Sequence, residues 1–179
     1  MKKTAIHEAG HAVACCRLTP SRYVGTVSIV PNHEEGYAGA HAPLESWDFD
    51  AAVAQQVVLY MCAGYAACVA AGVEPATAIE GCDSDFEQAK ELISIWRLAP
   101  FEEQVSQAVA LMRQPENIRA VARVTADLME HRLLFDDEID ILIDVADGEA
   151  SEEDLARFRV LSEAHARRAD AIGIKQATE

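Results

Sequence analysis

Residues 4–18 read TAIHEAGHAVACCRL, a run of small and apolar residues that contains two histidines four positions apart. Alanine dominates this run, and alanine has the highest intrinsic helix propensity of all residues. We predict a helix from about Lys3 to Leu18, ended by the turn-forming residues TPSR at 19–22. The apolar neighbours of the histidines indicate that this helix is buried and that the other elements pack around it.

The two histidines of this helix form the first candidate site. His7 and His11 lie one helical turn apart, so both imidazoles project from the same face. This spacing allows two ring nitrogens to bind one zinc ion at about 2.0–2.1 Å each. Glu8 follows the first histidine and can act as the general base that takes a proton from water. The pattern predicts a catalytic zinc site, and the alternative is an ordinary helix that carries two histidines by chance.

A catalytic zinc ion usually has three protein ligands and one open position, so a third ligand must come from elsewhere in the chain. The candidates are Glu80, Asp83, Asp85, Glu87, His33 and His41. Asp83 and Asp85 open a predicted helix, where one carboxylate can cap free backbone N–H groups while the other turns toward the metal. Residue type and position leave these two aspartates equal.

The rest of the chain predicts a mainly α fold (α+β), a helical bundle with a small β-hairpin or sheet after the zinc-binding helix. Residues 23–31 alternate with strand periodicity, and 37–43 is a weaker candidate for a returning strand. Apolar periodicity and cap residues predict further helices over 46–72, 83–98, 101–114, 115–134 and 135–146, and from 151 onward.

The chain divides at a change of character near residue 148. We predict one domain at 1–148 and a C-terminal helical extension at 149–179. The extension begins with a Ser-x-x-Asp cap at Ser151. Its charges are nearly balanced, and we expect its arginines, including Arg159, to be solvated.

Composition excludes several classes of partner. The net charge is −15, from 30 acidic and 15 basic residues, so the chain should repel nucleic acid and anionic membranes. The most apolar stretch, 51–73, is interrupted by Gln55 and Gln56 and indicates a core helix rather than a membrane span. The five cysteines of the chain contain no C-x-x-C pair, which favours neither disulfides nor a four-cysteine zinc site. Because residues 1–11 also lack a signal-peptide core, we expect a cytoplasmic protein.

Four stretches of the chain, in the same order, resemble the protease domain of the FtsH-type ATP-dependent zinc metallopeptidases. They are TAIHEAGHAV (4–13), VGTVSIVPNHEEGYAG (24–39), GCDSDFEQAKEL (81–92) and LMEHRLLFDDEIDIL (128–142). The first is similar to the family's His-Glu-Ala-Gly-His helix, and the third to its segment with an aspartate before a hydrophobic residue. The similarity covers about residues 3–145, and these two stretches are its most specific parts.

This resemblance implies a ligand set and an activity. The aspartate that matches the family's third zinc ligand is Asp85, which precedes Phe86. The implied zinc ligands are therefore His7, His11 and Asp85, with Glu8 as the general base, and Asp83 is left as the helix cap. The implied activity is zinc-dependent endopeptidase cleavage of small or unfolded polypeptides.

The chain also departs from the family pattern. The family's long helix usually carries Gly-Arg-Ala-Ala-Glu-Glu, whereas GYAACVAAG at 64–72 lacks the arginine and both glutamates. The sequence contains no G-x-x-x-x-G-K-[ST] phosphate loop. We therefore expect either a separate ATPase partner that delivers unfolded substrate or independent action on small peptides. Assembly into a homo-oligomer is a further alternative that the sequence leaves open. The alternative function is a non-catalytic zinc-binding or regulatory module.

Overall fold

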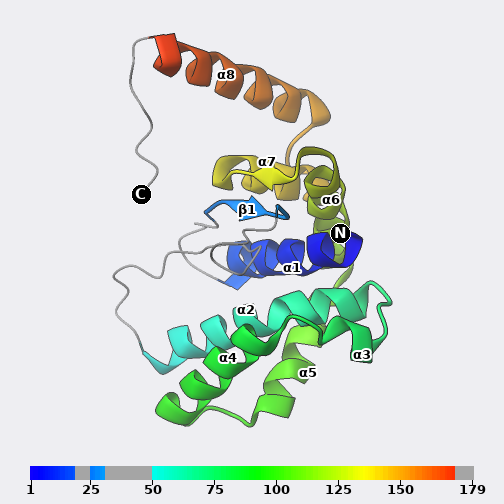
Figure 1. The fold of residues 1–179 in the computed structure, drawn as a ribbon, viewed down its shortest axis with the longest axis vertical. Coiled ribbons are helices and arrows are strands. Elements are labelled where there is room, and N and C mark those ends of the chain that lie inside the picture. Colours follow the sequence, from blue (N-terminus) through cyan, green and yellow to red (C-terminus); the bar gives the residue numbers. More distant parts are fainter. Residues whose placement is uncertain (19–24, 31–49, 172–179) are drawn as a thin grey trace.

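The computed structural model describes residues 1–18, 25–30 and 50–171, with side chains as far as Glu163. It has the mainly α architecture with a small sheet that the sequence predicts (Figure 1). The elements are α1 (Lys2–Leu18), β1 (Val27–Ser28), α2 (Ala51–Ala70), α3 (Pro75–Ala78), α4 (Asp83–Trp96), α5 (Phe101–Met112), α6 (Pro115–His131), β2 (Leu133–Leu134), α7 (Asp136–Asp147) and α8 (Glu152–Ala171).

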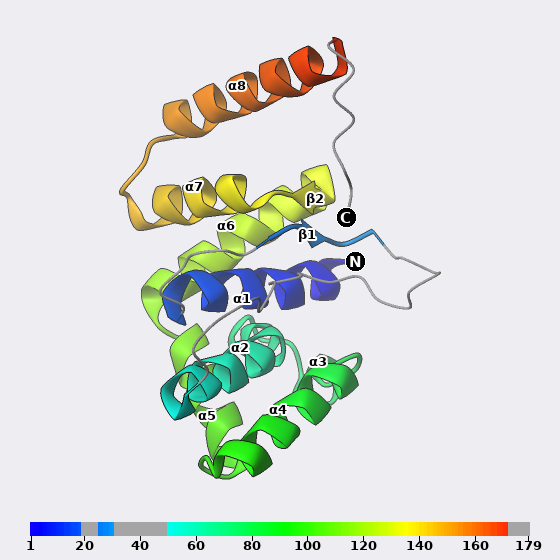
Figure 2. The ribbon, with the colours of Figure 1, turned by 90° about the vertical axis from the view of Figure 1, so that its left-hand side faces the viewer.

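Helix α1 lies in the middle of the bundle. It packs against α2 on one side and against α6 on the other. Figures 1 and 2 show that α4 and α5 lie beyond α2, whereas α7 and α8 lie on the opposite side of α1. Every residue from Ala5 to Cys15 is buried except His7, which is half-buried. The alanine-rich run at 4–18 is thus the central helix of the fold.

The helices α1 and α2 approach each other closely because the residues at their crossing are small. A Cβ atom added to Gly10 would lie 2.6 Å from the carbonyl oxygen of Ala63 and 2.6 Å from the Cβ of Ala67. No side chain fits in this space without moving the backbone of α2. Gly10 therefore lowers the helix propensity of α1 but permits the tight crossing that brings α2 to the histidines.

Helix α2 begins at an aspartate cap and runs through the core. The carboxylate of Asp50 accepts hydrogen bonds from the N–H groups of Ala52 and Val53 at 2.8 and 2.9 Å. By length and composition α2 could also cross a membrane, but 56% of its most apolar window is buried inside the fold. This burial is what the sequence predicts for a core helix.

The two strands pair over a long sequence separation. β1 is antiparallel to β2, with Val27 opposite Leu134 and Ser28 opposite Leu133. The predicted return strand at 37–43 lies outside the described residues. The predicted helix over 115–134 is wrong at its end, because Arg132 adopts a left-handed conformation (φ 67°) that stops α6 at His131.

Helix α8 is attached to the bundle by ion pairs and one buried leucine. The Asp154 N–H donates to Ser151 Oγ at 3.2 Å and the Ser151 N–H donates to the Asp154 carboxylate at 3.0 Å, which confirms the predicted cap. Leu155 is buried in the core. Arg159 donates to Asp127 at 2.6 Å and to Glu138 at 2.8 Å, so the expectation that it is solvated is wrong.

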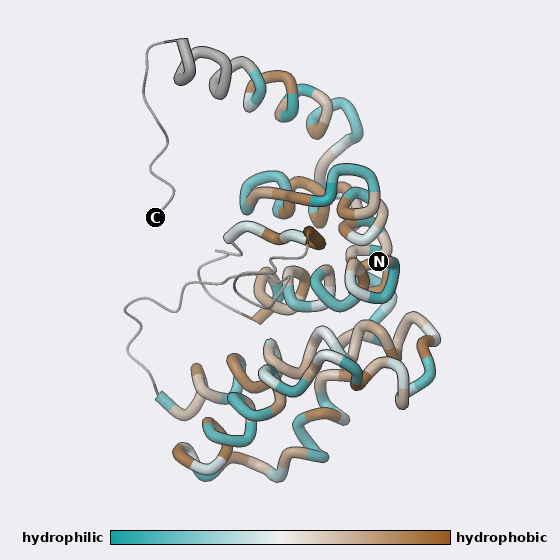
Figure 3. The backbone as a smooth tube through the Cα atoms, viewed as in Figure 1, coloured by the Kyte–Doolittle hydropathy of each residue, from teal (hydrophilic) through white to brown (hydrophobic). Residues whose placement is uncertain are grey.

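Hydropathy along the chain follows this arrangement. Figure 3 shows hydrophilic and hydrophobic residues alternating along α7 and the first turns of α8, as in amphipathic helices at a surface. Helix α7 ends at Asp147, and the positive φ of 82° at the following Gly148 allows the turn into α8. This turn coincides with the predicted boundary between the domain and its extension.

Candidate metal centre

Three potential metal ligands converge between α1 and α4. The Nε2 atoms of His7 and His11 are 3.1 Å apart, and the Oδ2 atom of Asp85 lies 3.3 Å from each of them. All three donor atoms lie within 4.8 Å of one another, the only such group of histidine, cysteine and acidic residues found in the described part of the chain. Asp85 comes from the first turn of α4, some 75 residues after the histidines.

The spacing of these atoms suits a small tetrahedral cation. An ion with ligand bonds of about 2.0–2.1 Å at tetrahedral angles holds its ligand atoms about 3.3–3.4 Å apart. The observed separations of 3.1, 3.3 and 3.3 Å form a nearly equilateral triangle of this size. Two imidazoles and one carboxylate are also ligands that zinc accepts, and three protein ligands leave a fourth position for water or substrate.

A glycine of α2 provides the space in which both imidazoles lie. A Cβ atom added to Gly64 would be 2.5 Å from Cε1 of His7 and 2.6 Å from Nε2 of both His7 and His11. Any side chain at this position would displace the rings from the shared site. Gly64 is therefore part of the candidate centre even though it offers no ligand atom.

Backbone and thiol groups orient the two histidine rings. The Nδ1 atom of His11 lies 3.0 Å from the carbonyl oxygen of Tyr60, and a carbonyl can only accept, so Nδ1 carries a proton and Nε2 is the nitrogen left for a metal. The Nδ1 atom of His7 lies 3.9 Å from the Sγ atom of buried Cys82. Such contacts to the second ring nitrogen fix the orientation of metal-binding histidines.

The segment before Asp85 is anchored to α1. The Lys3 ammonium group donates to the carbonyl oxygens of Thr77 and Glu80 at 3.2 and 2.6 Å, directly ahead of α4. Lys3 belongs to the same helix as the histidines. This link holds the loop that delivers Asp85 against the helix that carries the other two ligands.

An aromatic cluster fixes the start of α4 from the other side. The Phe86 ring packs edge-on against Tyr65 of α2 and Phe101 of α5, with centroid distances of 5.6 and 5.0 Å. Such contacts stabilise by about 0.5–1.5 kcal/mol each beyond the area they bury. Because Phe86 follows Asp85 directly, its packing restricts the position of the carboxylate.

The charge states favour Asp85 over the nearby thiols as a ligand. Burial alone would raise the pKa of Asp85, but hydrogen bonds from His11 and His7 outweigh it and hold that pKa well below its usual value. Burial, and then the charge of Asp85, raises the pKa of Cys62 and of Cys82 to about 12. The carboxylate is ionised at pH 7, whereas both thiols are neutral in the metal-free protein.

Glu8 lies next to the centre without joining the ligand triangle. It follows His7 on α1 and is only 4% exposed. Burial raises the pKa of Tyr60 above its usual value, and the charges of Cys15, Asp85 and Glu8 add to this effect. The charges of the candidate ligand Asp85 and of the candidate base Glu8 thus both affect the pKa of Tyr60.

Among the described residues, the other predicted ligands do not join the histidines. Asp83, Glu80 and Glu87 are exposed and lie outside the group formed by His7, His11 and Asp85. The candidates His33 and His41 lie outside the described residues. The predicted capping role of Asp83 is wrong, because Cys82 occupies the N-cap position and no side chain caps α4 there. Asp83 is instead the first helical residue, where its charge interacts favourably with the helix dipole.

Sequence reasoning missed the contributions of Gly64, the Tyr60 carbonyl and Cys82. Gly64 carried a usable signal, since an isolated glycine inside an otherwise apolar helix costs about 1 kcal/mol relative to alanine and calls for a packing reason. The Tyr60 carbonyl had no signal in the sequence, because any residue supplies the same backbone oxygen.

Comparison with known proteins adds no assignment: no protein-family model matches the chain, and no curated protein matches it.

Proposed function

We propose that this chain is a zinc-dependent endopeptidase that hydrolyses peptide bonds in small or unfolded polypeptides. One observation carries the proposal: His7 Nε2, His11 Nε2 and Asp85 Oδ2 lie 3.1–3.3 Å from one another beside a buried glutamate. Two histidines, one carboxylate and an adjacent glutamate are the residue types that metal-assisted hydrolysis of amides requires. Purely structural zinc sites have no need of the glutamate.

Each residue has a distinct role in this reaction. His7, His11 and Asp85 would hold the zinc ion, and zinc held there supplies Lewis-acid chemistry by polarising a carbonyl group and activating water. The Glu8 carboxylate takes a proton from the attacking water and returns it to the nitrogen of the departing amine. Gly64 leaves room for the imidazoles, and the Tyr60 carbonyl keeps His11 in the tautomer that binds a metal.

The resemblance to FtsH-type protease domains supports the same assignment. It identified Asp85, rather than Asp83, as the third ligand on the basis of the hydrophobic residue that follows it. The Phe86 contacts give this pairing a physical reason, since the aromatic side chain packs into the α2–α5 interface next to the carboxylate. In this proposal the chain is cytoplasmic, and it either acts alone on small or already unfolded peptides or receives unfolded substrate from a separate ATPase.

A second candidate function is that of a non-catalytic zinc-binding or regulatory module. It is favoured by the segment 64–72, which lacks the arginine and glutamates of the family. Tyr65 in this segment contacts Phe86, and Cys68 lies buried with its thiol 3.7 Å from the Lys3 carbonyl oxygen. This part of α2 is thus used for internal packing, and a function that depended on those charged residues would be lost.

Replacing Glu8 by glutamine separates the two functions. In the zinc-loaded protein, Glu8→Gln should keep one zinc per chain and reduce hydrolysis of unfolded β-casein by about 10²–10⁴-fold, because an amide cannot accept the proton. Glu87→Gln, an exposed change two residues from Asp85, is the matched control and should retain full activity. Equal activity of Glu8→Gln and the unmodified chain would exclude the mechanism. A zinc-loaded chain that never cleaves casein would favour the module.

A further inference from the structure

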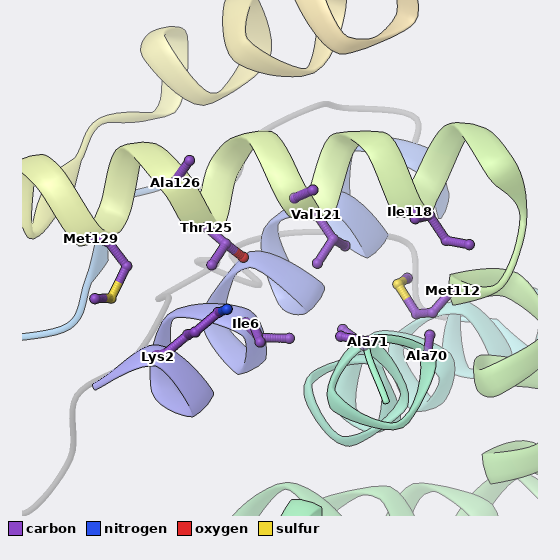
Figure 4. Close-up of a pocket in the computed structure, with 12 residues that line it drawn as sticks. Lys2, Ile6, Ala70, Ala71, Met112, Ile118, Val121, Thr125, Ala126 and Met129 are labelled. Atoms are coloured by element: carbon purple, nitrogen blue, oxygen red, sulfur yellow. The ribbon is translucent and has the colours of Figure 1, made fainter. Parts of the chain in front are cut away.

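A second potential binding site lies away from the metal centre, between α1, α2 and α6. It is a groove of about 500 Å³, within the range of about 300–1,000 Å³ that is typical of small-molecule sites. Figure 4 shows Ile6 of α1, Ala70 and Ala71 of α2 and Val121 of α6 facing this space. The metal ligands lie on the α4 side of α1 and α2, so the groove is a separate feature.

The groove is apolar apart from two groups. Its lining consists of alanines and of larger aliphatic or sulfur-containing side chains, with Thr125 and Lys2 as the exceptions. Alanines such as Ala67 keep the floor wide because their side chains are short. A surface of this kind gains free energy when an apolar molecule displaces its water.

Thr125 carries an unsatisfied hydroxyl group in the wall of the groove. The residue is 7% exposed, and its Oγ1 atom is buried without a hydrogen-bond partner among the described residues. Figure 4 shows this oxygen pointing from α6 into the space above Ile6. Since buried hydroxyls normally have a partner, the orphaned Oγ1 indicates a bound group that donates or accepts a hydrogen bond there.

Lys2 supplies the positive charge at the same place. It carries the only charge among the residues that line the groove, and it forms no ion pair with the residues that the structure describes. Figure 4 shows its ammonium group directed toward Ile6, on the side faced by the Thr125 hydroxyl. The groove thus offers a cation and a hydroxyl beside an apolar surface, in a chain whose net charge is −15.

We propose that this groove binds an amphiphile with a single acidic head group and an alkyl chain, such as a medium-chain fatty acid. The carboxylate pairs with Lys2 and accepts a hydrogen bond from Thr125, while the alkyl chain lies along the alanines of α2 and α6. Charge complementarity selects an acidic head over a cationic one. The proposal is independent of the metal centre and of peptidase activity.

The test uses the full chain, without added metal, in a ¹⁵N–¹H NMR titration with dodecanoate below its micelle concentration. We expect saturable binding of one molecule per chain with a dissociation constant of about 1 mM or tighter. Shifted resonances should cluster in α1, α2 and α6. Dodecyltrimethylammonium has the same alkyl chain with a cationic head, and it should bind at least about threefold more weakly.

Variants locate the binding site within the groove. Ala71→Leu adds a larger side chain at an exposed position that faces the groove in Figure 4 and should weaken dodecanoate binding about tenfold, whereas Ala110→Leu on exposed α5 surface should not. Thr125→Val and Lys2→Gln should each weaken binding about threefold, and Lys90→Gln should leave it unchanged. Ala70→Leu, at a neighbouring half-buried lining position, replaces Ala71→Leu if that variant misfolds.

Three results would overturn the proposal. One is the absence of saturable dodecanoate binding, and another is equal binding by Ala71→Leu and Ala110→Leu. Binding of dodecyltrimethylammonium as tight as that of dodecanoate would exclude the acidic head group. Thermal unfolding of each variant shows whether a lost signal reflects the groove or an unfolded chain.

Discussion

The crossing of α1 with α2 and the attachment of α8 are held together by different kinds of interaction. At the crossing, Gly10 and Gly64 let backbone and imidazole rings approach to distances at which no side chain fits. At α8, Arg159 bridges to Asp127 and Glu138, and Leu155 makes the buried apolar contact. The first interface depends on glycines that have no side chain, and the second depends on ion pairs near the surface.

This difference predicts how each region tolerates substitution. Close packing leaves no room for an added methyl group, so small changes at the crossing should have large effects on the site. Ion pairs that are partly exposed contribute little individually, since water and salt screen them. We therefore expect the metal centre to respond sharply to changes in α1 and α2 and weakly to changes in α8.

The largest expected effect is that of Gly64→Ala on zinc binding. The new Cβ atom would lie 2.5–2.6 Å from both imidazoles, so the zinc affinity should fall about 100-fold by competition with a chromogenic chelator. Alanine raises helix propensity by about 1 kcal/mol, which should offset part of the strain in the metal-free protein.

Gly10→Ala is the matched control for this glycine. Its Cβ atom would meet the backbone of α2 rather than the imidazoles, so it should lower the free energy of unfolding by about 1–3 kcal/mol. If Gly64→Ala binds zinc like the unmodified chain, the imidazoles do not lie against α2 as described.

A smaller effect is expected from Arg159→Ala. The change leaves the buried Asp127 with Arg123 as its remaining arginine partner, at 2.9 Å. The free energy of unfolding should fall by about 1–2 kcal/mol in urea titrations, without a change in zinc affinity. Arg157→Ala, at an exposed position of the same helix, should change the stability by less than about 0.5 kcal/mol.

The smallest effect is expected from Ser151→Ala at the start of α8. The Ser151 hydroxyl, and then its backbone N–H, lower the pKa of Asp154. Because the pKa of Asp154 is lower in the folded chain, its ionised carboxylate stabilises the fold at pH values above the ordinary carboxyl pKa. This stabilisation is lost as the pH falls through the lowered value. The variant should melt about 1–2 °C lower at pH 7, and this difference should shrink in acid. A difference that grows in acid would contradict the assigned bond.

Much of the fold was predictable because local signals agree with the tertiary structure. The alanine-rich run around His7, the Asp50 cap of α2 and the Ser151 cap of α8 each define a helix through nearby residues alone. The end of α6 was not predictable in this way. Leu133 and Leu134 continue an apolar helical pattern, and only pairing with β1, far away in the sequence, makes them a strand.

The candidate site was predictable as chemistry but only partly as geometry. The spacing of His7 and His11 identifies two ligands, since helix periodicity fixes their common face. Residue type could not separate Asp83 from Asp85, because their orientation depends on how Phe86 packs and where Lys3 holds the preceding loop. Such contacts are set by the tertiary structure and leave no pattern in the local sequence.

Zinc titration of Asp85→Ala beside Asp83→Ala tests the central claim most directly. Both variants remove one carboxylate from the first turn of α4, but only Asp85 lies 3.3 Å from both histidine nitrogens. We predict one zinc per chain in the unmodified protein, an affinity about 100-fold lower in Asp85→Ala, and an affinity within about twofold of the original in Asp83→Ala. Equal zinc affinities in the two variants would contradict a centre formed by His7, His11 and Asp85.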